Sequence, residues 1–437
     1  MTRRRLLLAP VWPCASIIFL AAGATSATAD QPASPPSASS TITLDDAIAL
    51  STSDNPTVNV ARQQWAQARA RVDEARAATR VTVSFNSTAG ESNADVATPP
   101  PASESFGSIV NSITLPLPIG RKPGVLVSEA DAQADAAEAS YAGAVRTQTN
   151  AVIAAYFDLL KKESQLSDAQ LAFGDAQRQQ DEAEKRNKAG DVPDLDVIRA
   201  EVPVASAQAA VAEAASAVDI ARETLNAAIG RPISTPVDVV ATAEEAPTSL
   251  TQEDVERRAV DNSADVTAAR STLSAEQSAY EAAKLWREPQ IALTASDARS
   301  GDVTALSRQD MIAASITVPL SDGGLASGQR REAEAAITQA KAQVDASTLS
   351  TQAAAASAYH NAVTTRQVAE TVKTALDLAQ TAYDKTMRGY QNGLFPLTDL
   401  LSAQAALAQT RGAYTEALYD AGAAQATLDA MMAPAQL

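Results

Sequence analysis

The sequence predicts a mainly α-helical protein with a membrane β-barrel contribution, built as two internal repeats. A Gly-Pro-Asp turn motif occurs twice, 203 residues apart, in KAGDVPDLDVIRA and QNGLFPLTDLLSA. Long alanine-rich stretches surround both copies. Four further segments alternate apolar and polar residues with the period of a β-strand. Each repeat is therefore expected to contain a helix, two strands and a long α-helical hairpin, which makes four β-strands per chain.

Residues 1–29 are predicted to be a signal peptide. They begin with an arginine cluster, continue with an apolar stretch and end in the small residues ATA, which fit a cleavage site. A retained membrane anchor is the alternative, but two prolines and a glycine interrupt the apolar run, which is shorter than the ~20 residues of a spanning helix. Residues 30–40 are predicted to be a low-complexity leader.

The composition excludes several classes of function. Loss of residues 1–29 removes three arginines and leaves 32 basic against 52 acidic side chains, so the net charge changes from −17 to −20. No nucleic-acid partner is expected, because phosphate binding needs a basic face. The only cysteine, Cys14, lies in the signal peptide, and the only histidine, His360, lies in a helical pattern. No catalytic residue, metal site or cofactor is therefore predicted.

The repeats are predicted at 41–229 and 250–433, on either side of a proline-rich connector at 230–249. Each repeat places two strands before its helical hairpin. The first has strands near 81–89 and 109–118 with a hairpin tip near residue 190, and the second has strands near 290–297 and 311–320 with a tip near residue 393.

The strands have the alternation and length of membrane-barrel strands. In SIVNSITLPLP, Ile109, Ile113 and Leu115 fall on one face, and Ser112 and Thr114 on the other. Tilted strands of about 9–11 residues cross a bilayer. The alternative is two edge hairpins packed on helices in a soluble domain. Four strands cannot close a membrane barrel, so subunits would have to share strands, and a pore favours three or more chains.

The segments that follow the strands are predicted to be long helices. Residues 124–188 contain no proline, and an apolar residue recurs at every seventh position from Val145 to Phe173, which favours coiled-coil packing. A helix of this length would be about 100 Å long. In the second repeat, the apolar stripe from Val368 to Tyr390 has a mixed period that predicts nearly straight helices.

The repeated turn motif predicts where each helix reverses. Gly190 and Gly393 suit the left-handed position after a helix, and Pro193 and Pro396 suit the first turn of the next one. An aspartate three residues after each proline lies near a positive helix N-terminus. Each motif is therefore expected to close a helical hairpin at the end away from the strands.

The order and duplication of these motifs resemble the TolC family of outer-membrane efflux proteins. TLDDAIALSTSDNP resembles the family's first helix, SITVPLSDGG its strand-to-helix junction, and the two G-x-x-P-x-x-D turns its hairpin tips. The resemblance implies a homotrimer with a twelve-stranded barrel in the outer membrane of a Gram-negative bacterium and a long periplasmic tunnel. It implies a periplasmic adaptor protein, an inner-membrane pump or secretion transporter, and outer-membrane lipid as partners.

The resemblance also assigns roles to residues at the tips. Gly190, Pro193, Gly393, Leu394 and Pro396 are expected to dock the adaptor, although Asp191 takes the place of Leu394 in the first copy.

Tyr390 and Asp399 match residues that close the family's periplasmic gate. Phe395 replaces the arginine partner of the tyrosine, and Ser402 replaces a second aspartate. The network that closes the gate is therefore expected to differ from the family's.

The expected function is a passive exit duct for efflux or secretion, coupled through the adaptor to an inner-membrane transporter, without enzymatic activity. One alternative is a soluble periplasmic coiled-coil structural or adaptor protein, and a more distant one is a hydrolase that uses carboxylates alone. The sequence leaves the substrate open among drugs, metals, oligosaccharides and proteins.

Overall fold

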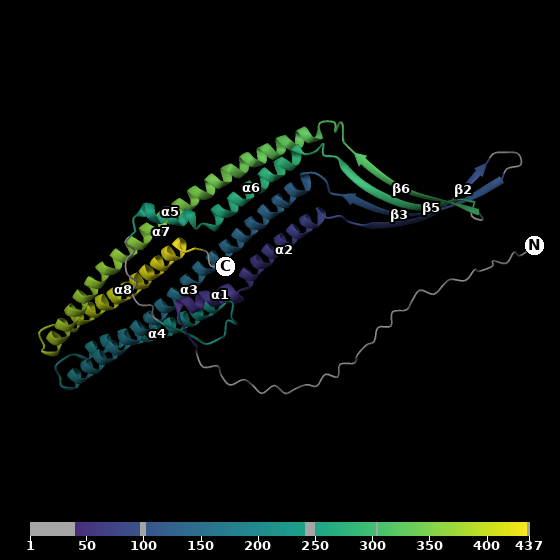
Figure 1. The fold of residues 1–437 in the computed structure, drawn as a ribbon. Coiled ribbons are helices and arrows are strands. Elements are labelled where there is room, and N and C mark those ends of the chain that lie inside the picture. Colours follow the sequence, from purple (N-terminus) through teal and green to yellow (C-terminus); the bar gives the residue numbers. More distant parts are fainter. Residues whose placement is uncertain (1–39, 97–101, 241–249, 303–304, 435–437) are drawn as a thin grey trace, which may run out of the picture. The chain divides into compact units, whose positions relative to one another are not determined.

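The computed structural model describes residues 40–96, 102–240, 250–302 and 305–434 (Figure 1). The predicted signal peptide and nearly all of the predicted leader lie outside the described residues, and so does the second half of the predicted connector.

Each repeat contains the same elements in the same order: two shorter helices, a pair of antiparallel strands and two long helices. In the first repeat these are α1 (Leu44–Asp54), α2 (Pro56–Ala78), β2 (Ser84–Val96), β3 (Ala102–Leu117), α3 (Lys122–Lys188) and α4 (Asp194–Ile229). In the second repeat they are α5 (Gln252–Asp261), α6 (Ala264–Lys284), β5 (Gln290–Asp302), β6 (Ala305–Thr317), α7 (Leu325–Gln391) and α8 (Leu397–Met432).

A capped break divides the helix that was expected before each strand pair. The Asn55 side chain accepts a hydrogen bond from the Thr57 amide at 2.8 Å and donates one to the Ala228 carbonyl at 2.9 Å. In the second repeat the Ser263 hydroxyl accepts from the Val266 amide at 3.3 Å. These side chains satisfy the free N–H groups at the start of α2 and α6, so a new helix begins there.

The four long strands form one antiparallel sheet in the order β2-β3-β5-β6. The pairing of β3 with β5 joins the two repeats, whereas β2 and β6 are the edges of the sheet within this chain. All four strands extend further from the helices than the alternation predicted, to Val96, Ala102, Asp302 and Ala305. The added segments are mostly polar or small, so they carry little alternation, but the backbone pairing continues through them.

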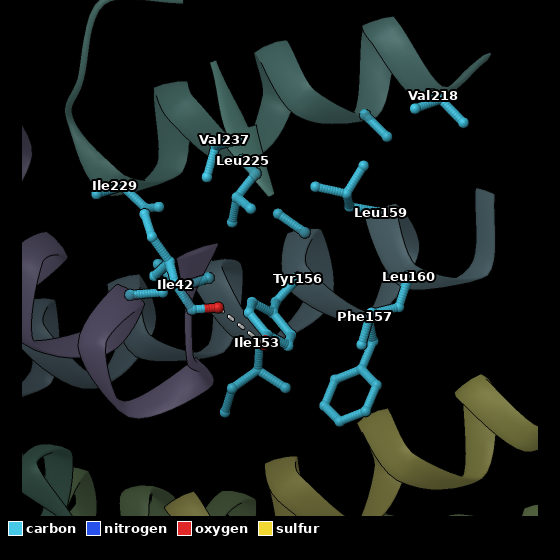
Figure 2. Close-up of a cluster of buried hydrophobic side chains, with 14 residues drawn as sticks. Ile42, Ile153, Tyr156, Phe157, Leu159, Leu160, Val218, Leu225, Ile229 and Val237 are labelled. Carbon is cyan, nitrogen blue, oxygen red and sulfur yellow. Dashed lines mark hydrogen bonds between the residues drawn. The ribbon is translucent and has the colours of Figure 1, made fainter. Parts of the chain in front are cut away.

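A small two-stranded sheet was missed by sequence reasoning. β1 (Ser40–Ile42) pairs in parallel with β4 (Val237–Val239), which lies in the predicted connector. Figure 2 shows Ile42 and Val237 in the main apolar cluster with Leu225 and Ile229. The buried Tyr156 hydroxyl donates to the Val240 carbonyl at 2.6 Å and lies 3.2 Å from the Ile42 carbonyl. Strands of three residues are too short to show a period.

The long helices pack as two hairpins, α3 with α4 and α7 with α8 (Figure 1). The predicted stripe of α3 faces this core, since Val145, Val152 and Leu159 are buried. In α7 the expected stripe begins one position later, because Val368 is exposed and Ala369 is buried. No helix in the described part of the chain is both long enough and apolar enough to cross a membrane.

Acidic side chains from different parts of the chain cap α3 and α7 where they leave the sheet. Glu288, from the second repeat, accepts hydrogen bonds from the Arg121 and Lys122 amides at 2.8 and 2.9 Å at the start of α3. At α7 the cap is local, because Asp322 accepts from the Gly324 amide at 3.0 Å and from the Ala326 amide at 2.6 Å. These hydrogen bonds lower the pKa of Asp322.

Candidate functional site at the hairpin tips

The first hairpin tip reverses the chain between α3 and α4. The Gly190 amide donates to the Asn187 carbonyl and the Asp191 amide to the Arg186 carbonyl, each at 2.9 Å. This pair of bonds closes a helix in the Schellman manner and requires a left-handed residue, which is Gly190 at φ +84°. The Asn187 side chain also donates to the Val192 carbonyl at 3.1 Å. The turn is therefore held by the local backbone and one side chain.

The second tip, between α7 and α8, has the same backbone geometry. The Gly393 amide donates to the Tyr390 carbonyl at 2.9 Å, and the Leu394 amide donates to the Gly389 carbonyl at 2.8 Å. Gly393 is left-handed, at φ +71°. The Phe395 ring lies directly over Gly389, where an added Cβ would collide with it. The two turns are thus equivalent in backbone, but only the second carries an aromatic ring on its helix.

The prolines were expected in the first turn of each new helix. The structure instead places each one at the position just before the helix begins. Pro193 and Pro396 are extended, with ψ near 160°, and precede α4 and α8 directly. The carbonyl of each proline accepts from an amide in the first helical turn, that of Asp196 at 3.0 Å and that of Asp399 at 3.2 Å. The fixed φ of proline therefore sets the direction in which the returning helix starts.

The two tips present different chemistry to solvent. At the first tip Asp191 and Asp194 are exposed. At the second tip Leu394 is 75% exposed and Phe395 is 46% exposed. At the position after the glycine, the same backbone motif therefore displays a carboxylate in the first repeat and an apolar side chain in the second.

The predicted gate residue Tyr390 is buried against the other hairpin. Its side chain is 2% exposed, and the Arg186 guanidinium lies 4.8 Å from the centre of its ring. Arg186 also donates to the Tyr390 carbonyl at 2.9 Å. Two interactions from one arginine therefore connect the end of α3 to the end of α7.

A second polar layer lies about two helical turns further from the tips. Tyr383 and Gln179 are both buried in this layer. Asp175, also mostly buried, pairs with Arg178. Burial raises the pKa of both Tyr383 and Tyr390, and the positive charge of Arg186 partly offsets this for Tyr390.

The structure does not bring Tyr390 and Asp399 into contact within this chain. Asp399 lies in the first turn of α8 with its side chain exposed. Sequence reasoning missed Arg186, whose guanidinium packs on the Tyr390 ring and donates to the Tyr390 carbonyl. A basic residue one helical turn before the first tip is visible in the sequence. Its partner, Tyr390, lies 204 residues away, so the spacing could not predict the pair.

Comparison with known proteins decides the family. The model of the outer membrane efflux protein family matches residues 47–231 and 256–433, which is most of the chain and both repeats. The chain belongs to this family.

Relatives of this outer membrane efflux protein agree with that assignment. It is 26% identical over 325 residues to the cobalt-zinc-cadmium resistance protein CzcC of Cupriavidus metallidurans, which covers 73% of this chain and 76% of CzcC. Its fold is similar to CusC, with a TM-score of 0.77 at 17% identity over 89% of this chain and 91% of that one. VceC of Vibrio cholerae has a TM-score of 0.71 at 22% identity over 90% and 97% of the two chains.

The family assignment confirms the expected function and location of this outer membrane efflux protein. It is an exit channel of the Gram-negative outer membrane with a periplasmic helical tunnel, and its family works in tripartite systems with an adaptor and an inner-membrane pump. The alternative of a soluble coiled-coil adaptor does not agree with this assignment. A channel family also gives no support to the carboxylate hydrolase.

Proposed function

We propose that three copies of this chain form a passive duct in which their sheets close a twelve-stranded barrel. The observation that carries the proposal is the open sheet, in which β2 and β6 have no neighbour on one side among the described strands. Such edges are not tolerated in lipid, so each β6 pairs with β2 of the next copy. The 67-residue helices α3 and α7 supply the tunnel, at ~1.5 Å per residue.

Exposed apolar residues on the helices support the same assembly. Leu195, Ile198 and Val202 form an exposed stripe on α4 that none of the described residues covers, and Leu349 and Leu378 are similarly exposed on α7. Helices of a single chain would leave these side chains in water, whereas neighbouring copies bury them.

Fractionation and sizing test this assembly. The full-length chain is expressed in a Gram-negative host, the membranes are separated by density, and the detergent-extracted protein is sized and added to planar bilayers. We expect an outer-membrane band with the mass of three chains and stable ion conductance. A soluble monomer in the periplasm would contradict the proposal.

We propose that the tips dock the adaptor and form the gate. Gly190 and Pro193 shape the first docking turn, and Gly393, Leu394 and Pro396 the second, where the exposed leucine offers the apolar contact. Because the first tip is acidic, the two tips meet different surfaces of the adaptor.

Within the gate, Arg186 replaces the absent arginine at position 395 by holding Tyr390 from the α3 side. Asp399 lines the entrance, where three copies would form a single acidic ring that favours cations. Asp399→Ala should weaken cation preference in planar bilayers, with Asp194→Ala as the matched control at the other tip. Unchanged selectivity would remove Asp399 from the gate.

Divalent transition-metal cations are the substrate class that we propose. The supporting observation is the likeness to a protein named for cobalt, zinc and cadmium resistance. In a host that lacks its own exit duct, the protein and its cognate adaptor and pump should raise tolerance to these metals more than tolerance to drugs. Raised drug tolerance without raised metal tolerance would contradict this assignment.

A further inference from the structure

One face of the four-stranded sheet changes from apolar to charged between two adjacent rows of side chains. Side chains two residues apart share a face, so the register defines rows that cross all four strands. The last apolar row is Phe85, Ile113, Ala295 and Ile312. The next two rows outward are Ser87, Asn111, Asp297 and Asp310, and then Ala89, Ile109, Arg299 and Arg308. The border, at the first polar row, therefore lies at the same height on every strand, and the charged side chains of these two rows all belong to β5 and β6.

Below the border, towards the helices, this face remains apolar. The two paired rows there are Leu115, Leu293 and Ala314, and Leu117, Ile291 and Ile316. The alternation continues past the end of β6 to Val318 and Leu320, which are exposed. Within β6 the apolar rows run from Ile312 to Ile316, which is four residues or about 14 Å of extended chain, and Val318 and Leu320 add to the apolar surface beyond the strand. Because the outward face of a membrane barrel carries a continuous apolar band, this is the face of the sheet that suits lipid.

The opposite face has no such band. Its rows consist mainly of serine, threonine and other small or polar residues, for example Asn86, Ser112 and Ser296, although Met311 ends that row with an apolar side chain. The apolar face is therefore the one that meets lipid, and the border marks where hydrocarbon gives way to lipid headgroups.

The charged rows carry two exposed arginines that share Asp297, and Arg308 also pairs with Asp310. Arg308 contacts Asp297 at 3.0 Å and Asp310 at 3.1 Å, and Arg299 contacts Asp297 at 3.4 Å. The side chains of Arg299 and Arg308 are nevertheless 50% and 60% exposed. A guanidinium has five N–H donors, so these contacts leave donors on both arginines free for a ligand.

An open hollow of about 560 Å³ straddles the border. Phe85, Ile113 and Ile312 line it on the apolar side, and Asp297 and Asp310 on the charged side. A lipid fits such a place because its acyl chains match the apolar side and its headgroup lies level with the arginines.

We propose that Arg299 and Arg308 bind the phosphate groups of outer-leaflet glycolipid, whose acyl chains lie on the apolar rows below. This inference rests on the proposed function, because it requires the sheet to span the outer membrane with the helices in the periplasm. Arginine suits the role because its planar fork binds phosphate through paired hydrogen bonds. Asp297 orients the two guanidiniums, and Asp310 competes with phosphate for Arg308.

Binding of lipid A to the purified oligomer tests the site. The protein is titrated with diphosphoryl lipid A in detergent, and bound lipid is counted by native mass spectrometry. The double variant Arg299→Gln/Arg308→Gln should weaken binding by about fivefold for each arginine removed. Arg231→Gln, in the connector between repeats, is the charge-matched control and should bind like the wild type. Monophosphoryl lipid A should bind more weakly than diphosphoryl lipid A to the wild type only.

A variant that is expected to bind lipid more tightly keeps the test valid if the double variant fails to fold. Asp310→Asn removes the competing carboxylate, so diphosphoryl lipid A should bind more tightly than to the wild type. Equal binding of lipid A by the wild type, Asp310→Asn and a folded double variant would overturn the lipid site. If the same samples lie in the outer membrane and conduct ions normally, the proposed duct function still stands. A wild-type protein outside the outer membrane would overturn both.

Discussion

At the scale of single residues, the tips show how much one position can decide. Gly190 and Gly393 both adopt a left-handed backbone that other residues rarely adopt, so the turn recurs with its glycine. The residue that follows each glycine is free to vary, and here it is Asp191 in one repeat and Leu394 in the other. The backbone of the tips is therefore shared, and their surface chemistry is specific to each repeat.

Replacement of Gly393 by alanine should destabilise the second hairpin. The left-handed backbone costs an L-residue about 1–2 kcal/mol, so the melting temperature of the detergent-solubilised protein, followed by circular dichroism, should fall. Gly412→Ala is the control, because an added Cβ there meets no atom within 4 Å and alanine favours the interior of α8. A Gly393→Ala protein as stable as Gly412→Ala would contradict the role of the turn.

Tyr383 and Tyr390 should ionise at higher pH than ordinary tyrosines. Burial raises the pKa of both hydroxyls above the usual 10.0, so the folded state favours their protonated forms. Their contribution to stability is complete below about pH 10 and is lost as the pH rises through the raised values. An absorbance titration should show a late tyrosinate component that Tyr383→Phe and Tyr390→Phe each reduce.

Arg186→Gln tests, in the same titration, whether the guanidinium affects the ionisation of Tyr390. Because the guanidinium favours tyrosinate, its removal should shift the ionisation of Tyr390 to still higher pH. A titration in which Arg186→Gln leaves the late component unchanged would show that the arginine does not act on this ring in solution.

At the scale of elements, the two repeats reach the same architecture through different contacts. Both long helices leave the sheet with a carboxylate on their first amides, but Glu288 comes from the opposite repeat, whereas Asp322 lies beside the helix it caps. The start of α3 therefore depends on the docking of the second repeat, and the start of α7 does not.

Glu288→Ala should destabilise the junction between the repeats. It removes two hydrogen bonds that cap the start of α3, so the free energy of unfolding should fall by about 0.5–2 kcal/mol. Glu281→Ala is the matched control, since it removes only an exposed ion pair with Lys284, which contributes about 0–1 kcal/mol. Equal losses for the two variants, measured by chemical denaturation, would argue against the cap.

At the scale of the whole molecule, a single chain has surfaces that other copies of the chain are expected to cover. The sheet has two open edges, and exposed apolar side chains line α4 and α7. A single chain with these surfaces is prone to associate, because apolar area in water is unfavourable in proportion to its size. Assembly is thus a requirement that follows from both parts of the fold, the strands and the helices.

Ile198→Ser/Val202→Ser should weaken the assembly of the tunnel. Both side chains are exposed on α4, so the change should leave the fold of one chain intact while it removes apolar contact between copies. Size-exclusion chromatography in detergent should show a shift from trimer to smaller species. Glu213→Gln, exposed on the same helix, should leave the trimer unchanged, and a trimer equally stable in the double variant would place the interface elsewhere.

What the sequence determined by itself is the set of features that local physics controls. The left-handed glycines, the presence of a proline where each returning helix begins and the alternation of the strands all follow from constraints within a few residues, and the 203-residue repeat duplicates them. The family resemblance rests on these features, and it was confirmed.

Only the tertiary structure decided which distant groups meet. The contact between Arg186 and Tyr390, the cap that Glu288 places on α3 and the pairing of β1 with β4 all join segments that are far apart in sequence. None of them leaves a periodic signal, because a cation, a carboxylate or a three-residue strand has no preferred partner until packing brings one within reach. The common border across the four strands is of the same kind, since only their register aligns its residues.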